Sequence, residues 1–210
     1  MTRLNEIMNK FLDLVFLTIY WLVSCIPIFT IGAATTSMYY TTQKVIKNDR
    51  GYVSGEYWRA FKENFKTATI CWLIQLALGL LFAEEGYLCY QLWANGDALG
   101  WLWVLFLVLE ILNVTVALVT FPYIARFDDR AKRVMKNALL ITLLHLPKTI
   151  LQVLLLAVFV IAVIFFVPVI LLAPAAYMLL SSFLLEKIFR KYMSPEDLEA
   201  ERQRNMTGGQ

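Results

Sequence analysis

The stretch that decides the fold is residues 149–185, TILQVLLLAVFVIAVIFFVPVILLAPAAYMLLSSFLL, in which thirty-seven consecutive positions carry no ionisable side chain. One bilayer crossing takes about 20 apolar residues, so the stretch is too long for one membrane helix and just long enough for two. A tight join near Phe166 to Pro168 would separate them, because proline interrupts a helix. Lys148 precedes the stretch and Glu186 follows it. The stretch therefore predicts a helical hairpin with both ends on the same side of a membrane.

The composition extends this prediction to the whole chain. Of 210 residues, 60% are hydrophobic and 17% charged, and the mean hydropathy is +0.62, whereas soluble domains are about a quarter charged. The length allows five or six crossings joined by short connections. We therefore expect an all-α polytopic transmembrane helical bundle, with five or six membrane helices in hairpins and amphipathic cytoplasmic connecting helices. Residues 1–193 would form this single domain, and residues 194–210 a short cytoplasmic tail.

The position of the charges predicts the orientation. The nineteen Lys and Arg residues fall into four groups, whereas residues 84–100 contain none and carry Glu84, Glu85 and Asp97. By the positive-inside rule the basic loops and the C-terminus are cytoplasmic and residues 84–100 lie outside. The net charge of +3 is too small to indicate nucleic-acid binding. Three scattered cysteines, Cys25, Cys71 and Cys89, form no CxxC pair, so we expect free buried thiols and no metal or other cofactor.

The N-terminal half predicts two more hairpins. Residues 14–43 lack ionisable side chains and contain a break at Pro27–Gly32. One interpretation is a single span followed by a cytoplasmic helix; the other, which places Arg3 and Lys10 inside, is a hairpin returning through residues 33–47. Residues 57–66 have the spacing of an amphipathic helix in the headgroup layer and continue without a proline to Trp93. A turn at residues 95–97 would lead into the next span, residues 98–124.

Three stretches together resemble the bacterial YesL family. They are residues 21–40, WLVSCIPIFTIGAATTSMYY, residues 61–66, FKENFK, and residues 145–149, HLPKT. The Pro-Ile-x-Thr-Ile-Gly segment is the most specific part, and the resemblance covers nearly the whole chain. It implies a small integral protein of the bacterial plasma membrane, often associated with carbohydrate uptake systems and without an assigned activity. It supplies no catalytic or binding residues.

Glu110 is the best single candidate for an intramembrane polar site. It lies near the centre of the predicted span 98–124, where an unpaired carboxylate costs several kcal/mol. Asn113 follows at i+3 and can share its helix face. The functional interpretation is a proton or cation relay or a polar substrate contact, and the structural one is an interhelical hydrogen bond. The Pro27–Gly32 break, with Thr30 and Thr35, could line the same kind of site or form a simple tight turn.

A second set of residues predicts an interface for lipid or a partner protein. Trp58, Phe61 and Phe65 recur every three or four residues, with Arg59 and Lys62 between them. His145, the only histidine, could respond to pH at the cytoplasmic interface or serve as a local hydrogen-bonding residue near a helix break. Plain anchoring in the headgroup layer explains the aromatic and basic residues equally well.

The function expected from these observations is not enzymatic. No GxGxxG, Walker, HExxH, GxSxG or EF-hand pattern occurs, and a membrane enzyme would have only His145 with Asp128 and Asp129. We expect an accessory, scaffold or regulatory protein that contacts the lipid bilayer and subunits of a sugar uptake transporter. The alternative is a small secondary transporter or channel using Glu110 and the Pro27–Gly32 break. The oligomeric state stays open.

Overall fold

The computed structural model describes residues 2–193 and residue 199, and within these residues the fold is all-α, as predicted. The predicted tail, residues 194–210, lies outside the described residues except for residue 199. Seven α-helices and four short 3-10 or π segments follow one another: α1 Thr2–Ser24, η1 Ile28–Thr30, α2 Ile31–Thr41, η2 Thr42–Ile46, α3 Val53–Ala94, η3 Ala98–Leu102, α4 Trp103–Arg126, α5 Ala131–Leu144, α6 Leu146–Phe165, η4 Val167–Leu171 and α7 Ala173–Phe189.

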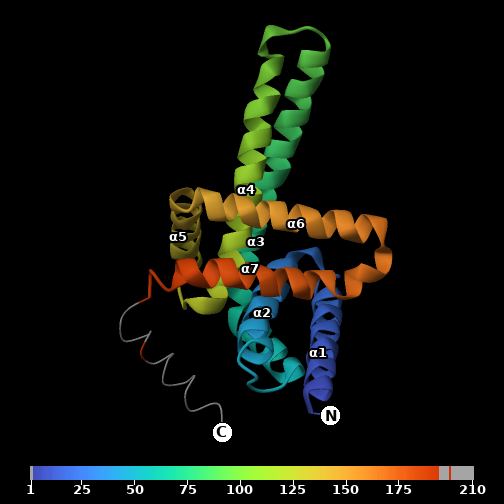
Figure 1. The fold of residues 1–210 in the computed structure, drawn as a ribbon. Coiled ribbons are helices and arrows are strands. Elements are labelled where there is room, and N and C mark those ends of the chain that lie inside the picture. Colours follow the sequence, from blue (N-terminus) through green and yellow to red (C-terminus); the bar gives the residue numbers. More distant parts are fainter. Residues whose placement is uncertain (1, 194–198, 200–210) are drawn as a thin grey trace.

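Helices α3 and α4 form a long hairpin whose far end projects beyond the rest of the described protein (Figure 1). The predicted continuity of residues 57–93 is confirmed, because α3 runs unbroken for 42 residues. The predicted turn is confirmed by Gly96, whose positive φ of 83° suits glycine. Close packing rests on small residues: a Cβ added to Gly86 would lie 3.3 Å from the Phe106 Cβ.

Helices α6 and α7 form the hairpin predicted from residues 149–185. The chain leaves α6 at Phe166 and re-enters a helix at Ala173, after the short η4 segment that contains Pro168. In Figure 1 both helices run across the direction of α3 and α4 rather than along it. The described residues therefore form two crossing hairpins rather than a set of parallel helices.

Helices α1 and α2 form the third hairpin of the described residues, joined at the predicted Pro27–Gly32 break. The Trp21 indole Nε1 donates a hydrogen bond to Thr35 Oγ1 near the turn. At the other end, Lys10 Nζ lies 3.0 Å from Asp49 Oδ1, just beyond η2. Contacts at both ends require the return limb to run antiparallel to α1. This limb is short, since α2 has 11 residues and the following π segment has 5.

Three helical stretches of the described residues are long and apolar enough to cross a membrane: Val53–Ala94, Ala98–Arg126 and Leu146–Phe165. This is fewer than the five or six expected. The physical reason is length and charge: α2 has 11 residues and α7 has 17, short of the roughly 20 that a crossing takes. The N-terminal half of α1 carries Lys10 and Asp13.

The core lies where α2 meets α3, α4 and α7. Gly32, at the start of α2, allows a close approach, because an added Cβ would lie 2.6 Å from the Ala68 backbone oxygen and 2.9 Å from the Phe121 ring. A buried polar cluster closes the same region from the side of α7. Glu186, only 7% exposed, lies 3.3 Å from Arg126 Nη2 and accepts a 3.1 Å hydrogen bond from the Tyr39 hydroxyl.

Candidate functional site

A cavity of about 770 Å³ lies among the three hairpins and brings together three of the predicted site residues. Glu110 and Asn113 from α4 line it together with Thr35 from α2. The rest of its wall comes from all the helices except α5 and is mostly apolar; it includes Leu76, Ala117, Phe121, Leu156, Phe159 and Met178. The sequence alone could not place Thr35 in one cavity with Glu110, because that depends on how α2 and α4 pack together.

Glu110 and Asn113 rest against α3 at Gly79. A Cβ added to Gly79 would lie 3.1 Å from Asn113 Nδ2 and 3.3 Å from Glu110 Oε1, so glycine leaves the room that these side chains occupy. Asn113 donates a 3.1 Å hydrogen bond to the Gln75 backbone oxygen, which clamps α4 to α3. Glu110 Oε2 is buried and has no hydrogen-bond partner among the described residues. An interhelical hydrogen bond therefore explains the role of Asn113, but it does not explain the buried Oε2 atom of Glu110.

Two glutamines that the sequence analysis passed over line the same cavity. Gln75 is 2% exposed and Gln152 is 1% exposed. Gln75 Nε2 donates to Thr120 Oγ1 at 2.9 Å, and Gln152 Nε2 donates to the Leu118 backbone oxygen at 3.2 Å and to Ser181 Oγ at 2.8 Å. Within the described part of the chain, the Oε1 atom of each has no partner. The sequence did contain a signal for these residues, namely a glutamine inside an otherwise apolar helix. Burying its polar amide there costs free energy, as burying the Glu110 carboxyl does.

The Pro27–Gly32 break is a tight turn, and Ile31 is its only residue that lines the cavity. Thr30 is buried, and its hydroxyl lies 2.5 Å from the Ser24 oxygen and 2.6 Å from the Pro27 oxygen. The Trp72 indole of α3 donates a 2.7 Å hydrogen bond to the Ile28 oxygen. Because these carbonyl groups already accept hydrogen bonds, the turn is satisfied internally, and Thr30 is not brought together with Glu110.

The predicted interface residues at the start of α3 are used partly for packing within the chain. Trp58 forms edge contacts with Tyr20 of α1 and with Phe61, and Phe61 packs on Phe65 with ring centroids 5.5 Å apart. Trp58 and Phe65 nevertheless keep more than a third of their surface exposed. Lys62 is exposed. This segment thus joins α3 to α1 and also presents an aromatic and basic surface.

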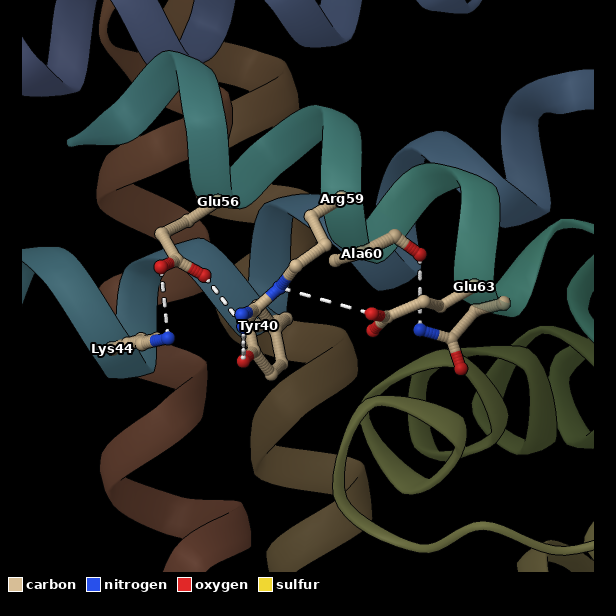
Figure 2. A network of polar contacts seen from close by, with 7 residues as sticks. Tyr40, Lys44, Glu56, Arg59, Ala60 and Glu63 are labelled. Carbon is tan, nitrogen blue, oxygen red and sulfur yellow. Dashed lines mark hydrogen bonds and ion pairs between the residues drawn. The ribbon is translucent and has the colours of Figure 1, made fainter. Parts of the chain in front are cut away.

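Arg59 belongs to a polar network between α3 and the α2–η2 segment (Figure 2). Its guanidinium lies 2.7 Å from Glu56 Oε2 and 3.8 Å from Glu63 Oε1, and it donates a hydrogen bond to the Tyr40 hydroxyl. Lys44 Nζ lies 2.8 Å from the other Glu56 oxygen. Figure 2 shows Glu56 between the two cations, so Arg59 braces the fold as well as facing the surface.

His145 lies at the break between α5 and α6. It is the C-cap residue of α5 and the N-cap residue of α6. Its Nε2 lies 3.1 Å from the Tyr192 hydroxyl. Partial burial and the nearby Lys148 and Lys191 lower the pKa of the imidazole below its usual 6.5. The ring is therefore neutral at pH 7, as expected of a local hydrogen-bonding residue.

The other groups considered for chemistry are separated or already paired. Asp129 accepts hydrogen bonds from Tyr123 and Arg133, both at 2.8 Å. Cys25, Cys71 and Cys89 are free thiols as predicted, although only Cys71 is fully buried. Among the described residues, no group of three or more His, Cys, Asp or Glu side chains could hold a metal ion.

One family model matches part of the chain. Residues 14–84 match the model described as "Protein of unknown function, DUF624". The matched range covers the second half of α1, the Pro27–Gly32 turn, α2 and most of α3. No curated protein and no solved structure matches the chain.

Proposed function

We propose that this chain is a non-enzymatic integral protein of the bacterial plasma membrane that acts as an accessory, scaffold or regulatory partner of a carbohydrate uptake system. The carbohydrate part rests on the resemblance to the YesL family. DUF624 is the domain of YesL-type proteins, and the matched range contains the Pro-Ile-x-Thr-Ile-Gly segment that carries the resemblance. The partner part rests on the projecting α3–α4 hairpin.

The hairpin is the observation that carries the proposal. Beyond the crossing with α6 and α7, its two helices contact each other and leave their outer faces uncovered by the rest of the described chain (Figure 1). Apolar side chains on these faces are exposed, including Leu81, Leu88, Leu99, Leu105 and Val108. Such faces suit lipid or the helices of a membrane partner, and small residues such as Gly86 permit close helix packing.

The charge pattern supports a multi-pass orientation with the partner on the outer half of the hairpin. The hairpin turn follows Glu84 and Glu85 and includes Asp97, whereas α2 and the start of α3, which carry or adjoin Lys44, Arg59 and Lys62, lie at the opposite end of the fold in Figure 1. The positive-inside rule then places the turn outside and the aromatic and basic start of α3 in the cytoplasm. There, anionic lipid or a cytoplasmic subunit would contact Trp58 and Lys62.

The test is recovery of the tagged chain from its native membrane in mild detergent or nanodiscs, followed by mass spectrometry. We expect stoichiometric recovery of uptake-system subunits. Leu88→Trp with Leu105→Trp should reduce that recovery, because bulky rings would block the hairpin faces. Leu154→Trp on the exposed side of α6 is the matched control and should leave it unchanged. Recovery of the chain alone would contradict the proposal.

A second candidate, a small secondary transporter or channel, is favoured by one observation: Glu110, Asn113 and Thr35 line the same cavity. The transport site of this candidate would be the cavity alone. The Pro27–Gly32 turn is not included, because the Thr30 hydroxyl and the Ile28 oxygen already form hydrogen bonds within the protein. The test is solute uptake or proton flux in proteoliposomes. A flux that depends on the reconstituted chain and is lost in Glu110→Gln would support transport, whereas no flux above empty liposomes would reject it.

A further inference from the structure

The cavity described above has a wall and an opening that suit a lipid more than a dissolved solute. Leu80 of α3 and Val160 and Ile164 of α6 line it and are each at least half exposed. Both helices belong to the stretches able to cross a membrane. The opening therefore faces the hydrocarbon region, where lipid chains are the surrounding medium. A volume of about 770 Å³ lies within the usual range of ligand pockets, about 300–1,000 Å³.

The polar groups in this apolar wall point to a specific kind of head group. Three buried oxygens of lining residues have no partner among the described residues: Gln75 Oε1, Gln152 Oε1 and Glu110 Oε2. A buried acceptor without a donor is costly, and the cost is removed when a ligand supplies the donor. The Tyr177 hydroxyl, buried beside Gln152 and Ser181, also lines the cavity and can donate or accept.

The surrounding hydrogen bonds fix the orientation of both glutamines, so the unpartnered atoms are acceptors. Gln152 faces the Leu118 carbonyl oxygen, which only its amide nitrogen can satisfy. Gln75 faces the Thr120 hydroxyl, which already donates to the Val116 oxygen and therefore accepts from Gln75. Exchanging the oxygen and nitrogen of either amide would lose these bonds. The complementary ligand accordingly carries hydrogen-bond donors.

We propose that this cavity binds one membrane amphiphile, an apolar chain whose head group carries hydroxyl donors, of the size of a monoacylglycerol. The chain lies against Leu76, Leu156 and Phe159, and the two hydroxyl groups donate to two of the three acceptors on Gln75, Gln152 and Glu110. The ligand enters sideways from the bilayer between Leu80 and Ile164. This proposal concerns the cavity and does not depend on the partner of the α3–α4 hairpin.

The experiment uses the purified full-length chain in nanodiscs and a monoacylglycerol with a photoactivatable diazirine in its chain. Peptide mass spectrometry locates the labelled residues after irradiation. We expect saturable labelling of about one probe per chain, on inner lining residues such as Leu76, Ala117 and Phe159. Labelling that does not saturate, and that falls mainly on outward residues such as Leu73 and Leu154, would overturn the proposal.

Competition separates the head group from the chain. Unlabelled monoolein supplies two hydroxyl donors, whereas methyl oleate has the same chain and none. We expect methyl oleate to compete about tenfold less well, the effect of roughly one hydrogen bond. In Gln75→Leu, which keeps a similar volume, this preference should disappear. Equal competition by the two compounds in the unmodified chain would overturn the proposal without reference to any variant.

A variant that fills the cavity tests the site, and the same substitution on an exposed face is its control. Ala117→Phe places a ring inside the cavity and should reduce specific labelling at least tenfold, whereas Leu154→Phe, on the exposed face of α6, should leave it unchanged. Elution as a single species in size-exclusion chromatography verifies that each variant is folded. Equal labelling of a folded Ala117→Phe variant and the unmodified chain would also overturn the proposal.

Discussion

Gly32 and Ala68 approach each other so closely that a methyl group on Gly32 would lie 2.6 Å from the Ala68 backbone oxygen. The second neighbour, Trp72 Cβ, is 2.7 Å away and is fixed to its backbone. Neither atom can move without shifting α3. This contact gives a physical reason for glycine at the end of the Pro-Ile-x-Thr-Ile-Gly segment.

The first prediction is that Gly32→Ala destabilises the protein by about 1–3 kcal/mol, the usual cost of overpacking a core. The measurement is the thermal unfolding midpoint in detergent, followed by size-exclusion chromatography. Gly55→Ala is the control, because no atom lies within 4 Å of its added Cβ and alanine favours a helix. An unchanged midpoint for Gly32→Ala would show that the α2–α3 contact is looser than described.

The second prediction concerns the ion pair between Arg126 and Glu186. Glu186→Leu should cost about 3–5 kcal/mol, because it leaves the partly buried Arg126 without this carboxylate. The double variant Arg126→Met with Glu186→Leu should recover a large part of the loss. A double-mutant cycle of unfolding midpoints measures the coupling. Additive losses would show that the two side chains do not interact.

The third prediction concerns Glu110. Glu110→Gln should accumulate in the membrane and unfold at nearly the same temperature as the unmodified chain, because glutamine keeps the shape beside Gly79. Asn113→Leu should lower the unfolding midpoint, since the Gln75 backbone oxygen loses its donor at a cost of about 1 kcal/mol. A clear loss of accumulation in Glu110→Gln would mean that the carboxylate charge itself holds the fold.

The fourth prediction concerns pH. Because the folded state lowers the pKa of His145 below 6.5, the unfolded chain binds the proton more readily. The contribution of His145 is therefore fully present above about pH 6.5 and is lost as pH falls through that value toward the folded pKa. Unfolding midpoints measured from pH 7.5 to 5 should fall more in the unmodified chain than in His145→Gln. Identical slopes would contradict the assignment.

Sequence patterns predicted the helices and their ends better than their arrangement. The long α3, the turn at Gly96 and the join at Phe166 follow from apolar runs and from proline and glycine, which act locally. The crossing of α6 over α4 does not, because it depends on which side chains of helices far apart in the sequence interlock. The length of α2 was likewise not predictable from the sequence, because a run of uncharged residues does not show where a helix ends.

The candidate site was predictable in part for the same reason. Glu110 and Asn113 stand out as polar residues of one helix face, and Thr35 was chosen for its hydroxyl. Their common cavity arises only from the tertiary fold. Thr30 was grouped with them from its position in the break, but its hydroxyl bonds to the Ser24 and Pro27 oxygens instead.

The length of α3 has a mechanical consequence. At about 1.5 Å per residue, its 42 residues extend for about 60 Å, roughly twice the hydrocarbon thickness of a bilayer. No proline interrupts it, so it forms one continuous element whose contact with α2 lies at Ala68. Contacts made near Trp93 and near Trp58 are thus held at a separation of about 50 Å by one helix.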